Sequence, residues 1–220
     1  AKARSGDFHL SNFRDLPMIP LSSQNHSRRC WVRFAILIAT FLSGELQAQT
    51  FTGPCPRRTS VVLSEIHYHP SGPEEISWKM EFIELCNSSP ISVDLSGWKL
   101  RGEVDFEIPE GVRLGGGEFL IIAADPASYS EVDVPVLGPW RGELSNKNGL
   151  VRIRKASGGI VLETEYRDES PWPFAADGAG HSLVLARPSF GESKAEAWSA
   201  SRNAGGSPGR VDPPPRHWHP

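Results

Sequence analysis

Cysteine, tyrosine and long apolar runs are all scarce in this sequence. Its 220 residues include three cysteines, three tyrosines and two methionines. No two cysteines form a C-x-x-C pair, which excludes a zinc knuckle. No segment holds a helical period over three turns, and a parallel α/β sheet cannot be built without crossover helices. Glycine and proline are abundant, at 21 and 19 residues, and predict many turns between short elements.

Basic residues are too few to form a nucleic-acid binding surface. The chain has 23 Lys/Arg and 26 Asp/Glu, for a net charge of −3. Residues 1–48 hold six of the basic and three of the acidic residues, so the remainder carries 23 − 6 = 17 against 26 − 3 = 23, a net charge of −6. An acidic domain without a basic cluster disfavours binding through phosphate contacts.

The first 48 residues have the layout of an export signal. Arg28, Arg29 and Arg33 precede the short apolar run at 34–42, and residues 46–48 offer a cleavage site. The run is too short to span a bilayer comfortably, and a short buried helix is the alternative. We therefore expect a leader with a signal peptide at 1–48, a linker at 49–59, and a mature protein that is secreted or held at the cell surface without a membrane span.

Export would permit a disulfide between Cys55 and Cys86, the two cysteines that follow the leader. Cys86 ends an apolar strand pattern, so a buried free thiol is the alternative. The sequence leaves both open, because it does not give the distance between the two residues.

The rest of the chain is a series of short strand patterns separated by turn residues. The patterns span 61–68, 79–87, 91–95, 98–102, 104–109, 118–124, 150–153, 160–166 and 181–187. Asn148-Gly149 is predicted to be a turn, 181–187 to be the last strand, and the stretch from 205 to be too rich in glycine and proline to pack. Eight or nine such strands predict an all-β fold, an antiparallel β-sandwich.

Seven motifs occur in a fixed order: "LSEIHYHP", "EFIELCN", "VDLSGWKL", "GGGEFLIIA", "GELSNKNGLVRI", "SPWPFAADGAGHSLVL" and "GGSPG". In this order the chain resembles bacterial lamin-tail domains over roughly residues 60–210. The resemblance implies an immunoglobulin-like β-sandwich that is not itself catalytic, with Trp98 in the core, Trp172 pinning a long loop, and Glu65 receiving loop hydrogen bonds. Residues 211–220 are then expected to be a disordered tail.

Glu65, His67 and His69 share one face of the first strand by alternation, with Val62, Ser64, Ile66 and Tyr68 on the other. A carboxylate and two imidazoles are zinc-ligand types. Because Pro70 follows His69 and places it in a loop, we expect no metal here but the solvated edge of a sandwich.

Other chemistries find weaker support in the sequence. Glu81 and Glu84 fall on opposite faces of a strand, which argues against an acid/base pair. Ser182 beside His181 is mere adjacency, and Cys86 has no fixed histidine partner. The loop residues Asp125, Asp133 and Asp177 lack calcium-loop spacing, and the glycines of 111–117 precede a strand rather than a phosphate-binding helix, so a hairpin turn is expected there.

These patterns predict a non-catalytic extracellular interaction or adhesion module without a cofactor. The expected partner is a protein or a surface polymer rather than nucleic acid, and the oligomeric state stays open. The alternative is an accessory domain of a larger secreted hydrolase, nuclease or spore-coat-kinase-like protein, since such domains resemble modules attached to those proteins. Fold alone does not choose between them.

Overall fold

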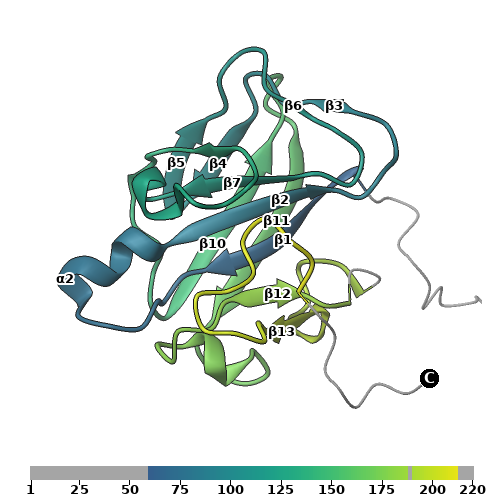
Figure 1. The fold of residues 1–220 in the computed structure, drawn as a ribbon. Helices are drawn as coiled ribbons and strands as arrows, with labels where there is room; N and C mark the ends of the chain where they lie inside the picture. The colour runs from purple at the N-terminus through teal and green to yellow at the C-terminus, as the bar shows by residue number, and fades with distance from the viewer. Residues whose placement is uncertain (1–58, 188–189, 213–220) are drawn as a thin grey trace, which may run out of the picture. The chain divides into compact units, whose positions relative to one another are not determined.

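The computed structural model describes residues 59–187 and 190–212, which fold as two packed sheets of short strands (Figure 1). The strands are β1 Val61–His67, β2 Phe82–Asn87, β3 Val93–Asp94, β4 Lys99–Gly102, β5 Val104–Glu107, β6 Arg113–Leu114, β7 Phe119–Ala123, β8 Val136–Leu137, β9 Arg141–Gly142, β10 Asn148–Arg154, β11 Ile160–Arg167, β12 Leu183–Leu185 and β13 Trp198–Ala200. The helical elements are α2 Glu74–Ser77, η1 Trp78–Met80, η2 Pro126–Tyr129, η3 Phe174–Ala176 and η5 Ala195–Ala197.

The two main sheets have the orders β13-β12-β1-β2-β7-β8 and β11-β10-β4-β5-β9, and β3 pairs with β6 in a small third sheet. Nine of the strands in the described ranges have three or more residues, which confirms the predicted immunoglobulin-like β-sandwich. One pair departs from the antiparallel pattern, because β8 runs parallel to β7. Among the described residues, no helix combines the length and apolar character needed to cross a membrane.

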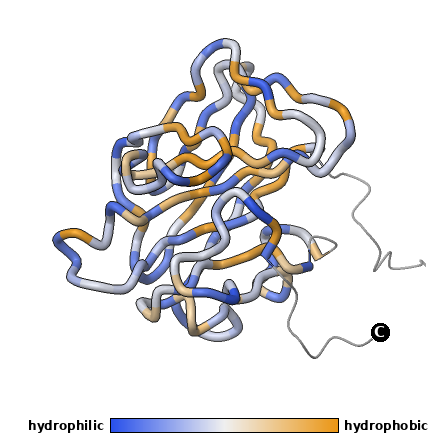
Figure 2. Tube along the Cα trace, viewed as in Figure 1, coloured by the Kyte–Doolittle hydropathy of each residue, from blue (hydrophilic) through white to orange (hydrophobic). Residues whose placement is uncertain are grey.

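The core lies between the two sheets and draws on both. Ile66, Ile83 and Leu120 of the six-stranded sheet are at most 1% exposed, as are Leu100 and Val151 of the five-stranded sheet. Alternation along each strand delivers these side chains to one face. Figure 2 shows hydrophobic stretches running through the strands in the middle of the fold.

The predicted aromatic anchors are confirmed. Trp98 is 8% exposed and joins the core, and its backbone N–H donates to the carbonyl of Leu95 across the tight bend that precedes β4. Trp172 is 7% exposed, with its ring 6.3 Å from that of Trp198 in β13. The long loop after β11 is therefore pinned to the sandwich by a pair of tryptophans.

Two local predictions are wrong. Asn148 and Gly149 belong to β10, where Gly149 pairs with Tyr166 of β11. A Cβ at Gly149 would meet the Tyr166 hydroxyl at 2.3 Å, so glycine is needed here because an aromatic ring lies over the strand and not because the chain turns. The last strand is β13, whose short run after η5 was missed because three residues carry no clear alternation.

A bulge in β1 resets its alternation. The pairing of β1 with β2 shifts between Leu63 and Glu65, so Val62 does not share the face of Ile66 as strict alternation predicts. Leu63 and Ile66 point into the core, whereas Glu65 and His67 point to the outer face of the six-stranded sheet.

That outer face carries a second, smaller apolar cluster. Phe82, Ile121 and Ala123 are fully buried beneath Tyr129 of η2, whose hydroxyl donates to the carbonyl of Met80 at 2.6 Å. The six-stranded sheet is thus covered on both faces, by the core on one side and by loop segments on the other.

Candidate functional site

The outer face of β1 holds the residues that sequence patterning nominated as metal ligands. Glu65 and His67 are each 1% exposed. The prediction of a solvated edge at these two residues is therefore wrong, because loop segments form a third layer over the sheet. His69 lies beyond the end of β1, with its Nδ1 2.7 Å from the Asp177 carboxylate.

Glu65 has a structural role that its environment defines. Its Oε1 accepts hydrogen bonds from the Ser182 hydroxyl and from the backbone N–H of Ser207 at 2.8 Å, and its Oε2 accepts from the Ser207 hydroxyl at 2.9 Å. These donors favour the charged carboxylate, but burial opposes it more strongly and raises the pKa of Glu65. The carboxylate ties β12 and the carboxyl-terminal segment to β1.

Glu84 is the register partner of Glu65 on β2 and lies on the same outer face. Its Oε1 is 2.6 Å from the Ser64 hydroxyl, and its Oε2 accepts from the backbone N–H of Gly209 at 2.6 Å. Burial raises the pKa of Glu84 to about 8, and the charge of Glu65 adds to the shift. Two carboxyl groups on paired strands therefore share one buried layer.

His67 packs edge-on against Phe82, with 5.5 Å between ring centroids. Neither ring nitrogen forms a hydrogen bond of ordinary geometry to a described residue. Burial lowers the pKa of His67 to about 4, although the backbone groups of Met80 and Gly180 lie near enough to favour the protonated ring. The imidazole is a neutral part of the packing at physiological pH.

This burial changes the expectation for His67→Ala. A surface histidine would cost less than about 1 kcal/mol on truncation, whereas a buried ring of this size leaves a cavity. We expect the free energy of unfolding to fall by about 2–4 kcal/mol. Urea denaturation of both proteins measures it, and a difference below about 1 kcal/mol would show that the ring is not packed as described.

The candidate ligands do not converge on a metal. Within residues 59–187 and 190–212, no group of three or more His, Cys, Asp or Glu side chains is arranged to hold an ion. Asp125 caps η2 by accepting from the N–H of Ala127 at 3.2 Å, Asp133 is exposed, and Asp177 faces His69. Each aspartate therefore has a separate local environment.

The acid/base candidates are equally separated. Glu81 accepts from the backbone N–H of Leu144 at 3.1 Å, at the core side of the sheet, and burial raises its pKa to about 7. Glu84 points to the opposite face. Neither carboxyl group opens onto solvent, since Glu81 is 4% and Glu84 1% exposed.

The side chains considered as nucleophile and base, Ser182 and His181, both form hydrogen bonds within the fold. Ser182 is fully buried and donates to Glu65, and the Nδ1 of His181 is 2.7 Å from the carbonyl of Ser201. Residues 205–209 match the motif G-x-S-x-G. It lies in a loop and not between a strand and a helix, and Ser207 is 3% exposed with its hydroxyl bonded to Glu65, so it lacks the setting of a nucleophile elbow.

Cys86 is half-buried at the end of β2 and forms no disulfide with another described residue. Burial raises the pKa of its thiol to about 11, with the charge of Glu84 adding to the shift, so the reactive thiolate is disfavoured. Its possible disulfide partner Cys55 lies outside the described residues, as do the predicted leader at 1–48 and the residues after 212.

The outer face of the five-stranded sheet carries charged side chains that reach solvent. It differs in this from the outer face of β1 and β2, whose carboxyl groups are buried. A charged row crosses the five strands in the order Glu163 (β11), Arg152 (β10), Arg101 (β4), Asp105 (β5) and Arg141 (β9). These side chains are 26–84% exposed.

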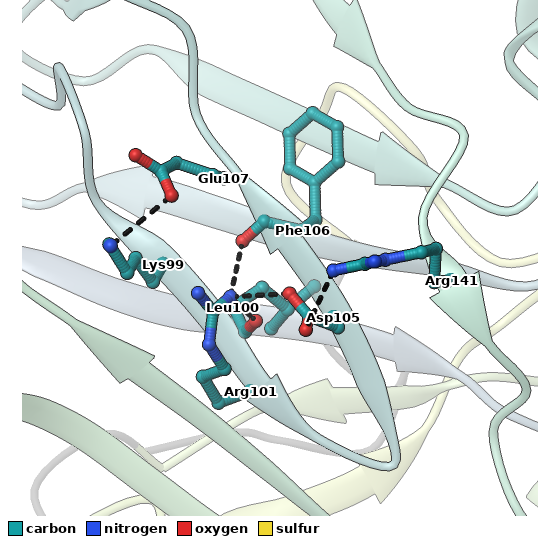
Figure 3. A network of polar contacts seen from close by, with 7 residues as sticks. All are labelled: Lys99, Leu100, Arg101, Asp105, Phe106, Glu107 and Arg141. Carbon is teal, nitrogen blue, oxygen red and sulfur yellow. Dashed lines mark hydrogen bonds and ion pairs between the residues drawn. The ribbon is translucent and has the colours of Figure 1, made fainter.

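Contacts along the charged row hold its side chains in place, and Figure 3 shows those of Arg101, Asp105 and Arg141. The Arg152 Nε donates to Glu163, and Arg101 lies directly opposite Arg152 in the register. A guanidinium nitrogen of Arg101 is 2.7 Å from one carboxylate oxygen of Asp105, and the other oxygen accepts a hydrogen bond from Arg141 at 3.2 Å. Arg101 also donates to the carbonyls of Leu100 and Phe106, which fixes its guanidinium.

A second line of charge flanks the charged row. Lys99 is 3.2 Å from Glu107 across the β4–β5 pair, as Figure 3 shows, and Arg154 lies opposite Lys99 in the register. The Arg154 guanidinium donates to the carbonyl of Gly158 at 2.9 Å. The visible sequence signal is the alternation of charged and apolar residues in "WKLRG" and "LVRIRK", but only the register brings the two segments together.

The sequence model of the lamin tail domain matches residues 56–168. The chain belongs to the lamin tail domain family. The lamin tail domain is a non-enzymatic, immunoglobulin-like fold. No curated protein matches the chain.

The lamin tail domain of this chain extends in space past the matched residues. β12 pairs with β1, and β13 pairs with β12, so both belong to the six-stranded sheet although they follow residue 168. The segment after β13 then supplies Ser207 and Gly209 to the buried carboxylates. The prediction that the glycine-rich stretch from 205 cannot pack is wrong for residues 205–210, because glycine lets the backbone approach side chains closely.

Proposed function

We propose that this chain is an exported, non-catalytic interaction module that binds a protein partner through the charged row. The observation that carries the proposal is the contrast between the two sheets. The outer face of β1 and β2 is sealed, with Glu65 and Glu84 each 1% exposed, whereas the charged row keeps 26–84% of each side chain in solvent.

The mixed signs of the charged row favour a protein over a uniformly anionic surface polymer. Arg152, Arg101 and Arg141 would attract such a polymer, but Asp105 between two of the arginines and Glu163 at the end of the row would repel it. A protein surface can present the complementary pattern of acids and bases. Arginines held by neighbours also lose little entropy on binding, and arginine is enriched in protein interfaces.

Export and a surface location are part of the proposal. Their support is the basic and apolar layout of residues 1–48 and the resemblance to bacterial modules. Amino-terminal sequencing of protein recovered from the medium is expected to begin near residue 49. An intact leader on that protein would contradict export through this segment. The rival proposal, an accessory domain of a larger secreted hydrolase, nuclease or spore-coat-kinase-like protein, would use the same face.

A charge swap tests the binding face. The double variant R152E/E163R keeps one ion pair between β10 and β11 but reverses its polarity. The matched control is D94R/R113D, which swaps the exposed pair whose charged atoms are 3.2 Å apart on β3 and β6. A photo-crosslinking residue in place of exposed Ile160, beside the row, reports the neighbour of this face on the producing cell.

We expect one discrete protein adduct from the parent chain, at least tenfold weaker for R152E/E163R and unchanged for D94R/R113D. A charge swap of this kind tests complementarity to the partner, because the ion pair within the fold is kept with its polarity reversed. Equal adducts from all three proteins would show that the charged row does not bind. Adducts to polysaccharide in place of protein would overturn the assigned class of partner.

A further inference from the structure

The segment after β13 is a strap across the outer face of β1 and β2. We define the strap as residues 203–212, shown in yellow at the carboxyl-terminal end of the described chain (Figure 1). It is held by two buried carboxyl groups: Glu65 accepts from the N–H and the hydroxyl of Ser207, and Glu84 accepts from the N–H of Gly209.

The backbone of the strap lies unusually close to the sheet. A Cβ at Gly206 would be 2.2 Å from the Glu65 carboxylate, and one at Gly209 would be 2.9 Å from Val132 and Val134. Both glycines also have positive φ, at +79°. The strap therefore fits between the paired strands and the segment after η2, and it covers the apolar cluster around Phe82.

The charges around the two carboxyl groups are unbalanced. Within the described ranges, no lysine, arginine or histidine forms an ion pair with Glu65 or Glu84. The groups that face them are the following: His67 of β1, Cys86 of β2, Ser182 beside His181 ahead of β12, Tyr129 of η2, and Ser207 and Asp212 of the strap. Tyr129 is neutral and Asp212 adds negative charge.

Protonation of Glu84 reduces the charge of the two carboxyl groups to a single negative charge. With Glu84 protonated, its Oε1 can donate to the Ser64 hydroxyl, which donates onward to the Glu84 carbonyl at 3.2 Å. Oε2 still accepts from Gly209, and Glu65 alone carries the charge, with three donors around it. Loss of the proton places two carboxylates side by side in a buried layer, where like charges repel strongly.

We propose that the strap is a pH-sensitive latch, which is closed while Glu65 and Glu84 share one negative charge and opens when both are ionised. Opening hydrates both carboxylates and uncovers the apolar cluster around Phe82 without breaking the sandwich core. The strap is bonded to the sheet through few contacts, so its opening free energy is expected to be lower than that of global unfolding.

Amide hydrogen exchange of the full chain tests the latch. We expect the protection factors of Ser207 and Gly209, corrected for intrinsic exchange, to fall about tenfold between about pH 7 and pH 9. The opening equilibrium shifts about tenfold per pH unit until the pH reaches the pKa of Glu84 in the closed state, about 8, and levels off above it. The β10 and β11 amides, which make the long antiparallel pair, keep their protection and show that the sandwich stays folded.

Two variants make the test specific. Glu84→Gln keeps an acceptor for Gly209 and a donor for Ser64 but cannot ionise, so its strap is expected to stay equally protected at both pH values. Ser207→Ala removes one hydroxyl donor and is expected to loosen the strap at both values without changing the pH dependence. Unchanged protection of the parent chain, or a pH dependence that persists in Glu84→Gln, would overturn the latch.

Discussion

Replacing Trp98 by alanine is expected to lower the free energy of unfolding by about 3–5 kcal/mol, as truncation of a buried aromatic ring does. The ring is 8% exposed and lies in the core cluster that joins both sheets. Its neighbours cannot collapse onto the vacancy, because the backbone at Trp98 is fixed by hydrogen bonds to Leu95 and Ile108 at the bend before β4. The loss is a large share of the roughly 5–15 kcal/mol that stabilises a domain of this size.

Phe174→Ala is the matched control for that substitution. Phe174 in η3 is 80% exposed, and its truncation is expected to change stability by less than about 0.5 kcal/mol. Urea denaturation with tryptophan fluorescence measures both variants. Equal stability of Trp98→Ala and the parent would mean that Trp98 does not anchor the bend, and that the strand register around β4 is different from the one described.

The core could be predicted from the sequence because its signal is local. Alternation in "EFIELCN" places Ile83 and Leu85 on one face, and the same alternation places Leu120 and Ile122 of β7 on theirs. Sheet formation then only has to bring such faces together. The number of strands of ordinary length was predictable for the same reason, whereas β13 has only three residues and gives no periodic signal.

The environment of Glu65 shows what the sequence could not give without the resemblance. A glutamate in alternation with histidines looks like a polar edge, and the residues that bury it are Ser182 and Ser207, 117 and 142 positions away. A glycine-rich stretch favours loop structure by its backbone freedom, but burial of that loop depends on a partner that composition does not reveal.

The charged row was missed for a related reason. Arg101 and Arg152 belong to separate strand patterns. In each pattern taken alone, a charged residue indicates only an ordinary solvent-facing position. Only the register of β4 with β10 sets them opposite each other, and register depends on turns and bulges elsewhere in the sheet. The periodicity of one strand therefore cannot predict a row of surface residues that extends across several strands.

The free energy of unfolding is expected to fall as pH rises from about 5 to 8.5. Glu84 and Glu81 have folded-state pKa values raised to about 8 and about 7 from the ordinary 4.5, chiefly by burial. A raised pKa means that the folded state holds its proton more tightly than the unfolded chain, so the stabilisation is complete below pH 4.5 and is lost as pH rises through the folded-state values.

His67 makes the free energy of unfolding rise with pH, but over a lower pH range than the glutamates. Its pKa is lowered from 6.5 to about 4 by burial, so its contribution is complete above pH 6.5 and is lost as pH falls toward 4. Between pH 5 and pH 6.5 the stability lost through the two glutamates exceeds the stability gained through this one histidine. Above pH 6.5 the histidine contributes no further change, so the decline is expected to be steepest between about pH 6.5 and pH 7, above which Glu84 alone continues it.

Glu84→Gln isolates the larger share of this decline. At about pH 8.5 the variant is expected to be more stable than the parent by on the order of 2–4 kcal/mol, since each unit of pKa shift corresponds to about 1.4 kcal/mol. At about pH 5 the two proteins are expected to be close, because Glu84 is then protonated and the amide reproduces its hydrogen bonds to Ser64 and Gly209. Exposed Glu131→Gln is the control and is expected to leave the pH dependence unchanged. Urea denaturation across this range gives the slope directly, and a parent protein as stable at pH 8.5 as at pH 5 would show that Glu84 is ionised and hydrated in the folded state, with the strap away from it.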